Sequence, residues 1–223
     1  MNKPAAAPLD LSADRARALA LTPVSPAARE RLDKFVALLL DWQTRGKLVG
    51  ASTLPQLWTR HIADSLQLLD LAPQAKIWVD FGSGGGFPGI PIACVLAETP
   101  GVLVHLVESN GKKANFLREA VRVTGVPALV HTERVEKFGD SFRQPVDVVT
   151  ARALAPLKLL CAQAFPLISK GATGLFLKGQ DVGSELTEAT KYWIIDCDQI
   201  PSRTNPDSRI IVIRQLQRRK HSA

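Results

Sequence analysis

Long apolar runs and paired cysteines are what this 223-residue sequence most plainly lacks. No apolar run reaches the roughly 18 residues that a membrane-spanning helix needs, and the opening MNKPAAAPLD contains no apolar segment of signal-peptide length. The three cysteines, Cys94, Cys161 and Cys197, lack the close spacing of a zinc or redox motif. We therefore expect buried, reduced thiols, no metal and no membrane contact, in a cytoplasmic protein.

Acidic residues are also few. The sequence has 21 Asp and Glu against 28 Lys and Arg, which gives a net charge of +7. Such an excess favours polyanionic partners through counterion release, although it can also serve solubility alone. Four basic residues near the end have no acid among them, which favours contact with nucleic-acid phosphates: Arg214, Arg218, Arg219 and Lys220.

The first third of the chain has the apolar spacing of helices. Apolar residues recur at helical intervals after Ser12, after Pro26 and again over residues 54–71. A length of 223 residues suits one α/β domain with an extension better than two full domains. We therefore expect residues 1–72 to form a helical extension that packs on a core domain of residues 73–223, and the Ala- and Pro-rich start to be loosely held.

Beyond residue 76 the pattern changes to short apolar runs that alternate with helix-like stretches. This alternation predicts a parallel sheet covered on both faces. The last two runs are separated only by the loop SRTNPDS, so we expect them to pair in antiparallel fashion. The predicted strands span residues 77–81, 102–108, 128–132, 146–151, 173–178, 192–196 and 209–216.

The first of these strands runs directly into a glycine-rich loop, DFGSGGGFPGIP. Four glycines within five residues let the backbone turn sharply and come close to a nucleotide-like cofactor. Gly84, Gly86 and Gly89 satisfy the G-x-G-x-x-G pattern of dinucleotide folds. In the alternative register, Gly82, Gly84 and Gly86 follow Asp80, which resembles the first motif of class I methyltransferases.

Glycine spacing alone leaves the identity of the cofactor open. Glu108, at the end of the second strand, suits the ribose of either cofactor. The antiparallel final pair favours the methyltransferase, because a dinucleotide fold ordinarily continues with parallel strands. Two alternatives remain: a nicotinamide-dependent oxidoreductase, which lacks a visible substrate domain here, and a non-enzymatic RNA-binding assembly protein, which leaves the glycine loop unexplained.

Several segments then narrow the choice, because together and in order they resemble the RsmG (GidB) family of small-subunit ribosomal RNA methyltransferases. The resemblance implies a class I S-adenosylmethionine-dependent fold: Rossmann-like, with a mostly parallel seven-stranded sheet whose last strand is antiparallel. It also implies methyl transfer to N7 of a guanine in 16S ribosomal RNA, acting as a monomer on that RNA or on the small subunit. The segments are RHIADSL at 60–66, DFGSGGGFPGIP at 80–91, VES with GKKANFLRE at 107–119, RVE at 134–136, ARAL at 151–154 and LKGQ at 177–180.

The same resemblance assigns roles to individual residues. His61, Asp64 and Lys178 would face the RNA and are, with Arg152, the candidates for a catalytic role. The alternatives are that His61 and Asp64 form a plain helix-surface pair, and that Glu136 is only a solvated helix residue. The cofactor contacts implied by the family fall on Gly82, Gly84, Phe87, Glu108, Val135, Glu136 and Arg152.

One segment departs from the family pattern, and no general base is evident in the sequence. Residues 47–49 read Lys-Leu-Val, where the family usually carries Asn-Leu-Thr, so the local contact with RNA or cofactor is in question. Guanine N7 has an in-plane lone pair at neutral pH, so its methylation needs no prior proton removal. Holding the reacting atoms in line can alone be worth roughly 7 to 11 kcal/mol, so the lack of a catalytic dyad is expected.

Overall fold

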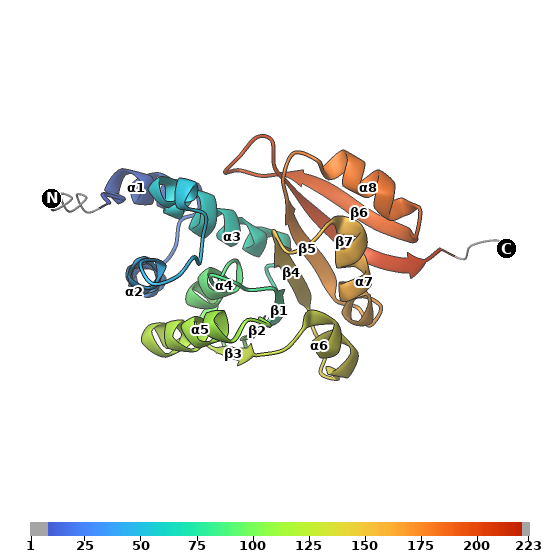
Figure 1. The fold of residues 1–223 in the computed structure, drawn as a ribbon, viewed down its shortest axis with the longest axis horizontal. Helices are drawn as coiled ribbons and strands as arrows, with labels where there is room; N and C mark the ends of the chain where they lie inside the picture. The colour runs from blue at the N-terminus through green and yellow to red at the C-terminus, as the bar shows by residue number, and fades with distance from the viewer. Residues whose placement is uncertain (1–8, 220–223) are drawn as a thin grey trace, which may run out of the picture.

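The computed structural model describes residues 9–219, beginning with two α-helices that lie to one side of a central sheet (Figure 1). Helix α1 spans Ser12–Leu21 and helix α2 spans Pro26–Gln43. Ser25 caps α2 by accepting a hydrogen bond from the backbone N–H of Ala28. Pro26 suits the first helical position, because an N–H there would have no partner within the helix.

A run of short helical turns follows where the sequence predicts one further helical pattern. The turn at residues 58–63 is widened to a π-helix, and Asp14 of α1 explains why. The Asp14 carboxylate accepts the backbone N–H groups of Trp58 at 2.7 Å and Thr59 at 3.3 Å, so these donors do not depend on carbonyls one turn earlier. Turns of this type often occur at functional sites. The run consists of η1 (Ala51–Gln56), η2 (Trp58–Ala63), α3 (Asp64–Leu66) and η3 (Gln67–Leu71).

A seven-stranded sheet forms the centre of the molecule, in the order β3-β2-β1-β4-β5-β7-β6. The first five strands are parallel, and β7 joins β5 in antiparallel fashion with Lys178 opposite Arg209. This confirms the predicted fold class. The strands are β1 (Ile77–Phe81), β2 (Leu103–Val107), β3 (Ala128–His131), β4 (Val148–Arg152), β5 (Thr173–Lys178), β6 (Trp193–Pro201) and β7 (Arg209–Arg218).

Helices cover both faces of the sheet. Alternate side chains of β1 enter different cores: Trp78 packs with the N-terminal helices, whereas Val79 and Phe81 pack on the other face. The first core also holds α4 (Gly89–Leu96) and α5 (Gly111–Thr124). The second core is covered by α6 (Val135–Ser141), α7 (Leu157–Ile168) and α8 (Val182–Thr190).

The strand order places a crevice at the carboxyl ends of β1 and β4. These neighbouring strands are followed by helices on opposite faces of the sheet, which is the switch point where ligands bind in open α/β sheets. Both the glycine loop after β1 and Arg152 at the end of β4 lie there. No helix within residues 9–219 is long and apolar enough to cross a bilayer.

The expectation that the four basic residues near the end lack counter-charge is wrong for Arg214, which forms an ion pair with Asp198 of β6. β7 also extends to Arg218, two residues beyond the predicted strand over residues 209–216. The Arg218 guanidinium lies over the ring of Trp193, with 5.7 Å between its carbon and the ring centroid. Lys220 and most of the Ala- and Pro-rich start lie outside the described residues.

Candidate cofactor and substrate cleft

The glycine loop gives this crevice its shape. Gly82, Gly84 and Gly86 all have positive φ angles, of 66°, 53° and 90°. A Cβ at Gly82 would lie 2.6 Å from Leu154, so this position must be glycine for packing within the protein. A Cβ at Gly84 would meet nothing nearer than a backbone oxygen at 3.6 Å, so the space beside Gly84 is open to a ligand.

Glu108 fastens the loop to the next strand. One oxygen of its carboxylate accepts the backbone N–H of Gly84 at 3.0 Å, and the other accepts that of Asn110 at 2.7 Å. Gly84 and Glu108 line a hollow of about 300 Å³ together with Val135 and Glu136 of α6. A carboxylate that can accept from ribose hydroxyls, beside an apolar side chain and an open loop, fits the adenosine half of S-adenosylmethionine.

Glu136 is an exposed helix residue whose carboxylate is nevertheless bound to the protein. Its carboxylate accepts a hydrogen bond from the Gln163 amide at 2.7 Å, and this bond holds the pKa of Glu136 below its usual value. Val135, beside it, is buried. Both residues therefore have fixed positions at the wall of the smaller hollow.

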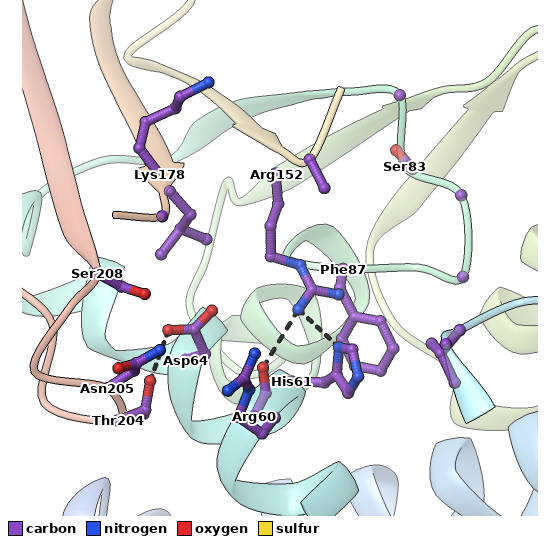
Figure 2. A pocket seen from close by; sticks show the side chains of 18 of the residues that line it. Arg60, His61, Asp64, Ser83, Phe87, Arg152, Lys178, Thr204, Asn205 and Ser208 are labelled. Carbon is purple, nitrogen blue, oxygen red and sulfur yellow. Dashed lines mark hydrogen bonds between the residues drawn. The ribbon is translucent and has the colours of Figure 1, made fainter. Parts of the chain in front are cut away.

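A larger hollow of about 500 Å³ lies on the other side of the loop, with Gly82 and Gly84 shared between the two. Figure 2 shows its centre, where Arg152 points toward His61. Arg152 Nη1 lies 2.6 Å from His61 Nδ1 and 3.3 Å from the Arg60 carbonyl oxygen. The guanidinium carbon also lies 4.9 Å from the centroid of the Phe87 ring. Three neighbours thus hold the arginine in place.

These contacts fix the tautomer of His61. Arginine can only donate, so Nδ1 of His61 must accept, and the ring proton must be on Nε2. Nε2 lies 2.8 Å from the Thr53 hydroxyl, which donates in turn to the carbonyl oxygen of Gly50 at 2.7 Å. Burial, followed by the charges of Arg152 and Arg60, lowers the pKa of His61 to about 3. His61 is therefore neutral, and it positions Arg152 rather than carrying a proton.

Asp64 is held by the loop between β6 and β7. One oxygen, Oδ1, accepts from the Thr204 hydroxyl at 2.7 Å and from the Gln67 amide at 2.9 Å, and the Ser202 hydroxyl lies 3.3 Å away. Burial raises the pKa of this carboxyl above its ordinary value, against the opposing effect of these hydrogen bonds. Oδ2 has no hydrogen-bond partner within residues 9–219, and Asp64 lines the larger hollow. A surface pair between His61 and Asp64 is excluded, because each has its own partners inside the protein.

Lys178 lies across the cleft at the end of β5. Its ammonium forms an ion pair with Glu185 at 2.6 Å and donates to the Ala155 carbonyl at 3.0 Å. Glu185 also accepts the backbone N–H of Leu157 at 2.6 Å. Lys178 therefore ties three segments together, besides lining the cleft.

Beneath the cleft, Asp80 is fully buried at the end of β1. It accepts the Thr150 hydroxyl at 2.9 Å and the Gly89 N–H at 3.2 Å. Burial raises the pKa of Asp80 to about 6, although these donors and Arg152 act in the opposite direction.

The segment that departs from the family pattern covers the glycine loop. The side chain of Gln43 accepts the backbone N–H groups of Leu48 and Val49 and donates to the Val49 carbonyl, all within 3.0 Å. A Cβ at Gly85 would lie 3.1 Å from the Leu48 carbonyl oxygen. The segment therefore forms one wall of the cleft through its backbone, which the change of side chains leaves intact.

The structure brings every candidate site residue from the sequence to this edge of the sheet. Gly82, Gly84, Glu108, Val135 and Glu136 line the smaller hollow, whereas Phe87, Arg152, His61, Asp64 and Lys178 line the larger one. Sequence reasoning missed the residues from the β6–β7 loop. A loop rich in Ser, Thr and Asn before an antiparallel last strand is the signal that could have located them, because such a strand begins at the carboxyl edge of its parallel neighbours. The lining residues from this loop are Thr204, Asn205 and Ser208; Arg60 of η2 and Lys113 of α5 also line the larger hollow without having been predicted to do so.

Comparisons with known proteins identify relatives over almost the whole chain. The family model described as "rRNA small subunit methyltransferase G" matches residues 28–210. A protein of Bradyrhizobium sp. strain BTAi1, named ribosomal RNA small subunit methyltransferase G, is 60% identical over 208 residues, which cover 93% of this chain and 94% of the relative. A protein of the same name from Nitrobacter hamburgensis is 56% identical, with coverage of 98% and 85%.

Solved structures share the fold at much lower identity. A putative O-methyltransferase from Klebsiella pneumoniae has a TM-score of 0.58 at 14% identity, and the match covers 91% of this chain and 96% of that one. An O-methyltransferase from Bacillus cereus, solved in complex with SAH, has a TM-score of 0.57 at 13% identity, with coverage of 91% and 97%.

Proposed function

Because the chain belongs to the rRNA small subunit methyltransferase G family, whose cofactor is S-adenosylmethionine, we propose that it methylates N7 of a guanine in 16S ribosomal RNA. The cofactor supplies an electrophilic methyl group, and this chain supplies the geometry. Gly84, Glu108 and Val135 hold the adenosine side, while the residues around Arg152 receive the base. We propose that the reaction takes place in the cytoplasm and that a monomer performs it.

The observation that supports guanine as the substrate base is that Asp64 lines the same cleft as Arg60 and Arg152. Guanine presents the acceptors O6 and N7 on one edge, and donors at N1 and N2 on another. Arg152 and Arg60 can donate to O6, and the free Oδ2 of Asp64 can accept from N1–H or the N2 amino group. Adenine has a donor in place of O6 and an acceptor at N1. Its amino group would therefore face the arginine donors, and its N1 would face the Asp64 acceptor.

The cleft also suits a reaction that needs no general base. Arg152 occupies Nδ1 of His61, and Thr53 accepts the proton on Nε2. Neither ring nitrogen is available to take a proton from a substrate, and none has to be removed from guanine N7. Rate enhancement by alignment is consistent with a site whose cation is fixed by three neighbours.

The target base must be presented outside its helix. N7 lies in the deep, narrow groove of A-form RNA, which side chains cannot read, so a single-stranded or unstacked guanine is required. The partner is therefore 16S ribosomal RNA, free or within a small subunit, with the guanine in an open segment.

The division of the chain is a related proposal. Helical turns end at Leu71 and the first strand begins at Ile77, which supports an extension of residues 1–72 and a cofactor-binding domain of residues 73–223. The extension supplies His61 and Asp64, so it would complete the RNA side of the cleft rather than fold apart from it.

Mass spectrometry of small-subunit RNA tests the proposal. A strain without the gene should lack one 7-methylguanosine, and the purified protein with S-adenosylmethionine should restore that methyl group on small subunits from this strain. A protein with Asp70→Asn, a carboxylate on the exposed side of the same helical run, should restore it equally well. An unchanged 7-methylguanosine content in the deletion strain, or a new methyl group at another atom, would refute the proposal.

A further inference from the structure

A second groove adjoins the large cleft, between the end of α2 and the start of α5. Its volume is about 380 Å³. Leu48 and Lys113 line both this groove and the cleft, so the two hollows share a wall beside the glycine loop. We refer to it as the lysine groove; its lining residues are Trp42, Arg45, Gly46, Lys47, Leu48, Asn110, Lys112, Lys113 and Asn115.

The charge of this groove is strongly positive and largely uncompensated. Four of its lining residues are basic and none is acidic. Arg45 forms an ion pair with Asp41. The ammonium groups of Lys47, Lys112 and Lys113 form no ion pair or hydrogen bond with any residue from 9 to 219. By contrast, carboxylates pair with the ammonium groups of Lys34, Lys158, Lys178 and Lys191.

Two of these lysines occupy a position that does not favour helix stability. Lys112 and Lys113 lie in the first turn of α5, whose backbone N–H groups are capped by the Asn110 side chain. The N-terminus of a helix carries partial positive charge, so cations in its first turn are unfavourable and acids are favourable. The first turn of α5 contains no acid. These lysines therefore do not contribute to the stability of the helix, and their charges are available to a ligand.

The floor of the groove is apolar and aromatic. Trp42 and Leu48 form it, and the Trp42 ring packs edge-on against Phe116 with 5.6 Å between centroids. Trp42 is half-buried, whereas the other three tryptophans, Trp58, Trp78 and Trp193, are buried. A partly exposed indole beside cations is the combination with which proteins bind single-stranded nucleic acid, by stacking on bases and pairing with phosphates.

We propose that the lysine groove binds the single-stranded RNA that flanks the methylated guanine, with phosphates on Lys47, Lys112 and Lys113 and a base against Trp42. The inference rests on the proposed function, because it assigns the groove to the same RNA as the cleft. Because Leu48 and Lys113 line both hollows, one strand can extend from the cleft directly into the adjoining groove. Uncompensated positive charge selects a polyanion over an apolar peptide or a second copy of this cationic chain.

The test uses the full-length protein with Lys47→Ala and Lys112→Ala together, and leaves Lys113 intact because it also lines the cleft. Small subunits from a strain lacking the gene are methylated at several salt concentrations. For each phosphate that the variant no longer binds, KM should rise about fivefold at 0.1 M salt, and the log–log salt slope should flatten by about 0.7. The kcat and the affinity for S-adenosylhomocysteine should not change. The melting temperature should stay the same or rise, because one cation leaves a helix N-terminus.

A matched control removes equal charge from the opposite edge of the sheet. Lys76 precedes β1 and Lys170 follows α7, and within residues 9–219 the Lys170 ammonium donates only to the Phe142 carbonyl. The double variant Lys76→Ala, Lys170→Ala should keep the KM and the salt slope of the unaltered protein. If KM and the salt slope change equally in both double variants, RNA binding depends on net charge alone, and the proposal that the lysine groove binds RNA is wrong.

Intrinsic fluorescence separates failure of the groove from failure of the proposed function. A single-stranded ribo-oligonucleotide should quench the emission of the half-buried Trp42, and the quenching should be lost in Trp42→Phe and weakened in the Lys47→Ala, Lys112→Ala variant. If the protein methylates no small-subunit RNA but the quenching is found as described, the proposed function fails and the groove stands. Absent quenching together with an unchanged KM overturns the groove alone.

Discussion

Both ring nitrogens of His61 form hydrogen bonds within the protein, Nδ1 with Arg152 and Nε2 with Thr53. This histidine therefore positions Arg152 and does not transfer a proton. Its pKa is lowered to about 3, so the ring stays neutral as an acceptor for Arg152. We therefore expect the kcat of methyl transfer to show no histidine ionisation between pH 6 and 8. His61→Ala should lower kcat roughly tenfold to a hundredfold by releasing Arg152, because misplacement by about 1 Å can have that effect. An inflection near pH 6.5 that disappears in His61→Ala would show instead that His61 carries a proton.

Asp64→Asn tests the recognition of guanine with little change to the fold. An asparagine can keep its carbonyl oxygen at the Oδ1 position, where Thr204 and Gln67 donate. Its amide nitrogen then replaces Oδ2 and presents a donor to the guanine donors. An unpaired buried polar group costs about 1 to 3 kcal/mol, so kcat/KM should fall roughly 5- to 150-fold. Steady-state kinetics on small subunits measure this, and activity within twofold of the unaltered protein would exclude contact between Asp64 and the base.

His105, far from the cleft, makes acid stability depend on a buried histidine. It is buried beside His131, its Nε2 has no partner within residues 9–219, and burial lowers its pKa to about 4. Between pH 6.5 and 4 the unfolded chain binds a proton that the folded chain does not. Stability is therefore lost as the pH falls through this window, by at most about 1.4 kcal/mol per pH unit for this one group.

His105→Phe should remove that dependence. Phenylalanine keeps the ring contacts with Phe138 and Phe142 and removes a buried nitrogen without a partner, while the half-buried His131 can turn to solvent. Urea unfolding at pH 8 should show equal or greater stability, and the loss between pH 6.5 and 4 should be smaller than in the unaltered protein. Asp80, whose pKa is raised to about 6, acts with the opposite sign between its ordinary value and pH 6 in both proteins, so it cancels in the comparison. Equal pH slopes in the two proteins would contradict the assignment.

Within the glycine loop, two glycines should respond differently to the same change. A Cβ at Gly84 would clash with nothing in the protein, since its one neighbour is a backbone oxygen at 3.6 Å. Gly84→Ala should therefore cost about 1 to 2 kcal/mol for its positive φ, and its methyl group should obstruct the cofactor. S-adenosylhomocysteine at a hundred times its Kd should stabilise the unaltered protein by about 2.7 kcal/mol, and NAD should not. This ligand-induced rise in melting temperature should be lost in Gly84→Ala.

Gly89→Ala is the matched comparison. Its Cβ would lie 2.3 Å from a methyl group of Leu106 and 2.9 Å from the Asp80 carboxylate, which is a clash within the protein. We expect overpacking to cost roughly 1 to 3 kcal/mol, with the response to S-adenosylhomocysteine retained in the molecules that stay folded. Thermal unfolding with and without the ligand separates the two effects. A Gly84→Ala protein that still responds fully would show that the cofactor lies elsewhere.

The strands differ in how well the sequence predicts them. β1 and β5 match their predicted bounds because each is one apolar run between breaks. The sequence predicts that β6 ends at residue 196, but the strand continues to Pro201. From Asp196 onward the strand is mostly polar and no residue of it is fully buried, which is the composition of a half-covered strand rather than of a buried one. The apolar run alone predicts the shorter strand, because it does not include this polar part.

Some site residues can also be placed from the sequence, whereas others cannot. Gly82, Gly84 and Glu108 follow strands directly, so their place at one edge can be derived from the pattern of strands. Thr204 reaches Asp64 only because β7 pairs with β5, at a separation of more than thirty residues, and sequence spacing does not encode that pairing. His61 and Arg60 reach Arg152 from a π-helical turn that depends on Asp14 of another helix, and sequence spacing does not encode this contact either.

On the scale of the whole molecule, β7 carries basic residues at both of its ends, at opposite edges of the sheet. The pair Lys178 and Arg209 marks the edge with the cleft, and the pair Trp193 and Arg218 lies at the far end of the same antiparallel ladder. β7 has ten residues, so the two ends are roughly 30 Å apart. A short oligonucleotide in the cleft cannot contact Arg218, whereas a folded ribosomal RNA or a small subunit can.

This separation makes the basic residues at the far end of β7 a test of substrate size. Removing Arg218 and Arg219 should flatten the log–log salt slope for binding small subunits by about 0.7 to 0.9 for each phosphate that is no longer bound, and should leave the slope for a short oligonucleotide unchanged. Arg214→Ala is the control, because the charge of Arg214 is balanced by Asp198. Since Arg218 also packs on Trp193, the melting temperature of the variant is measured first, and Arg218→Lys should recover the slope with part of the packing. Equal slopes for the subunit before and after the change would restrict the contact with RNA to the cleft edge, and the basic residues at the far end would then serve only the packing of β6 and β7.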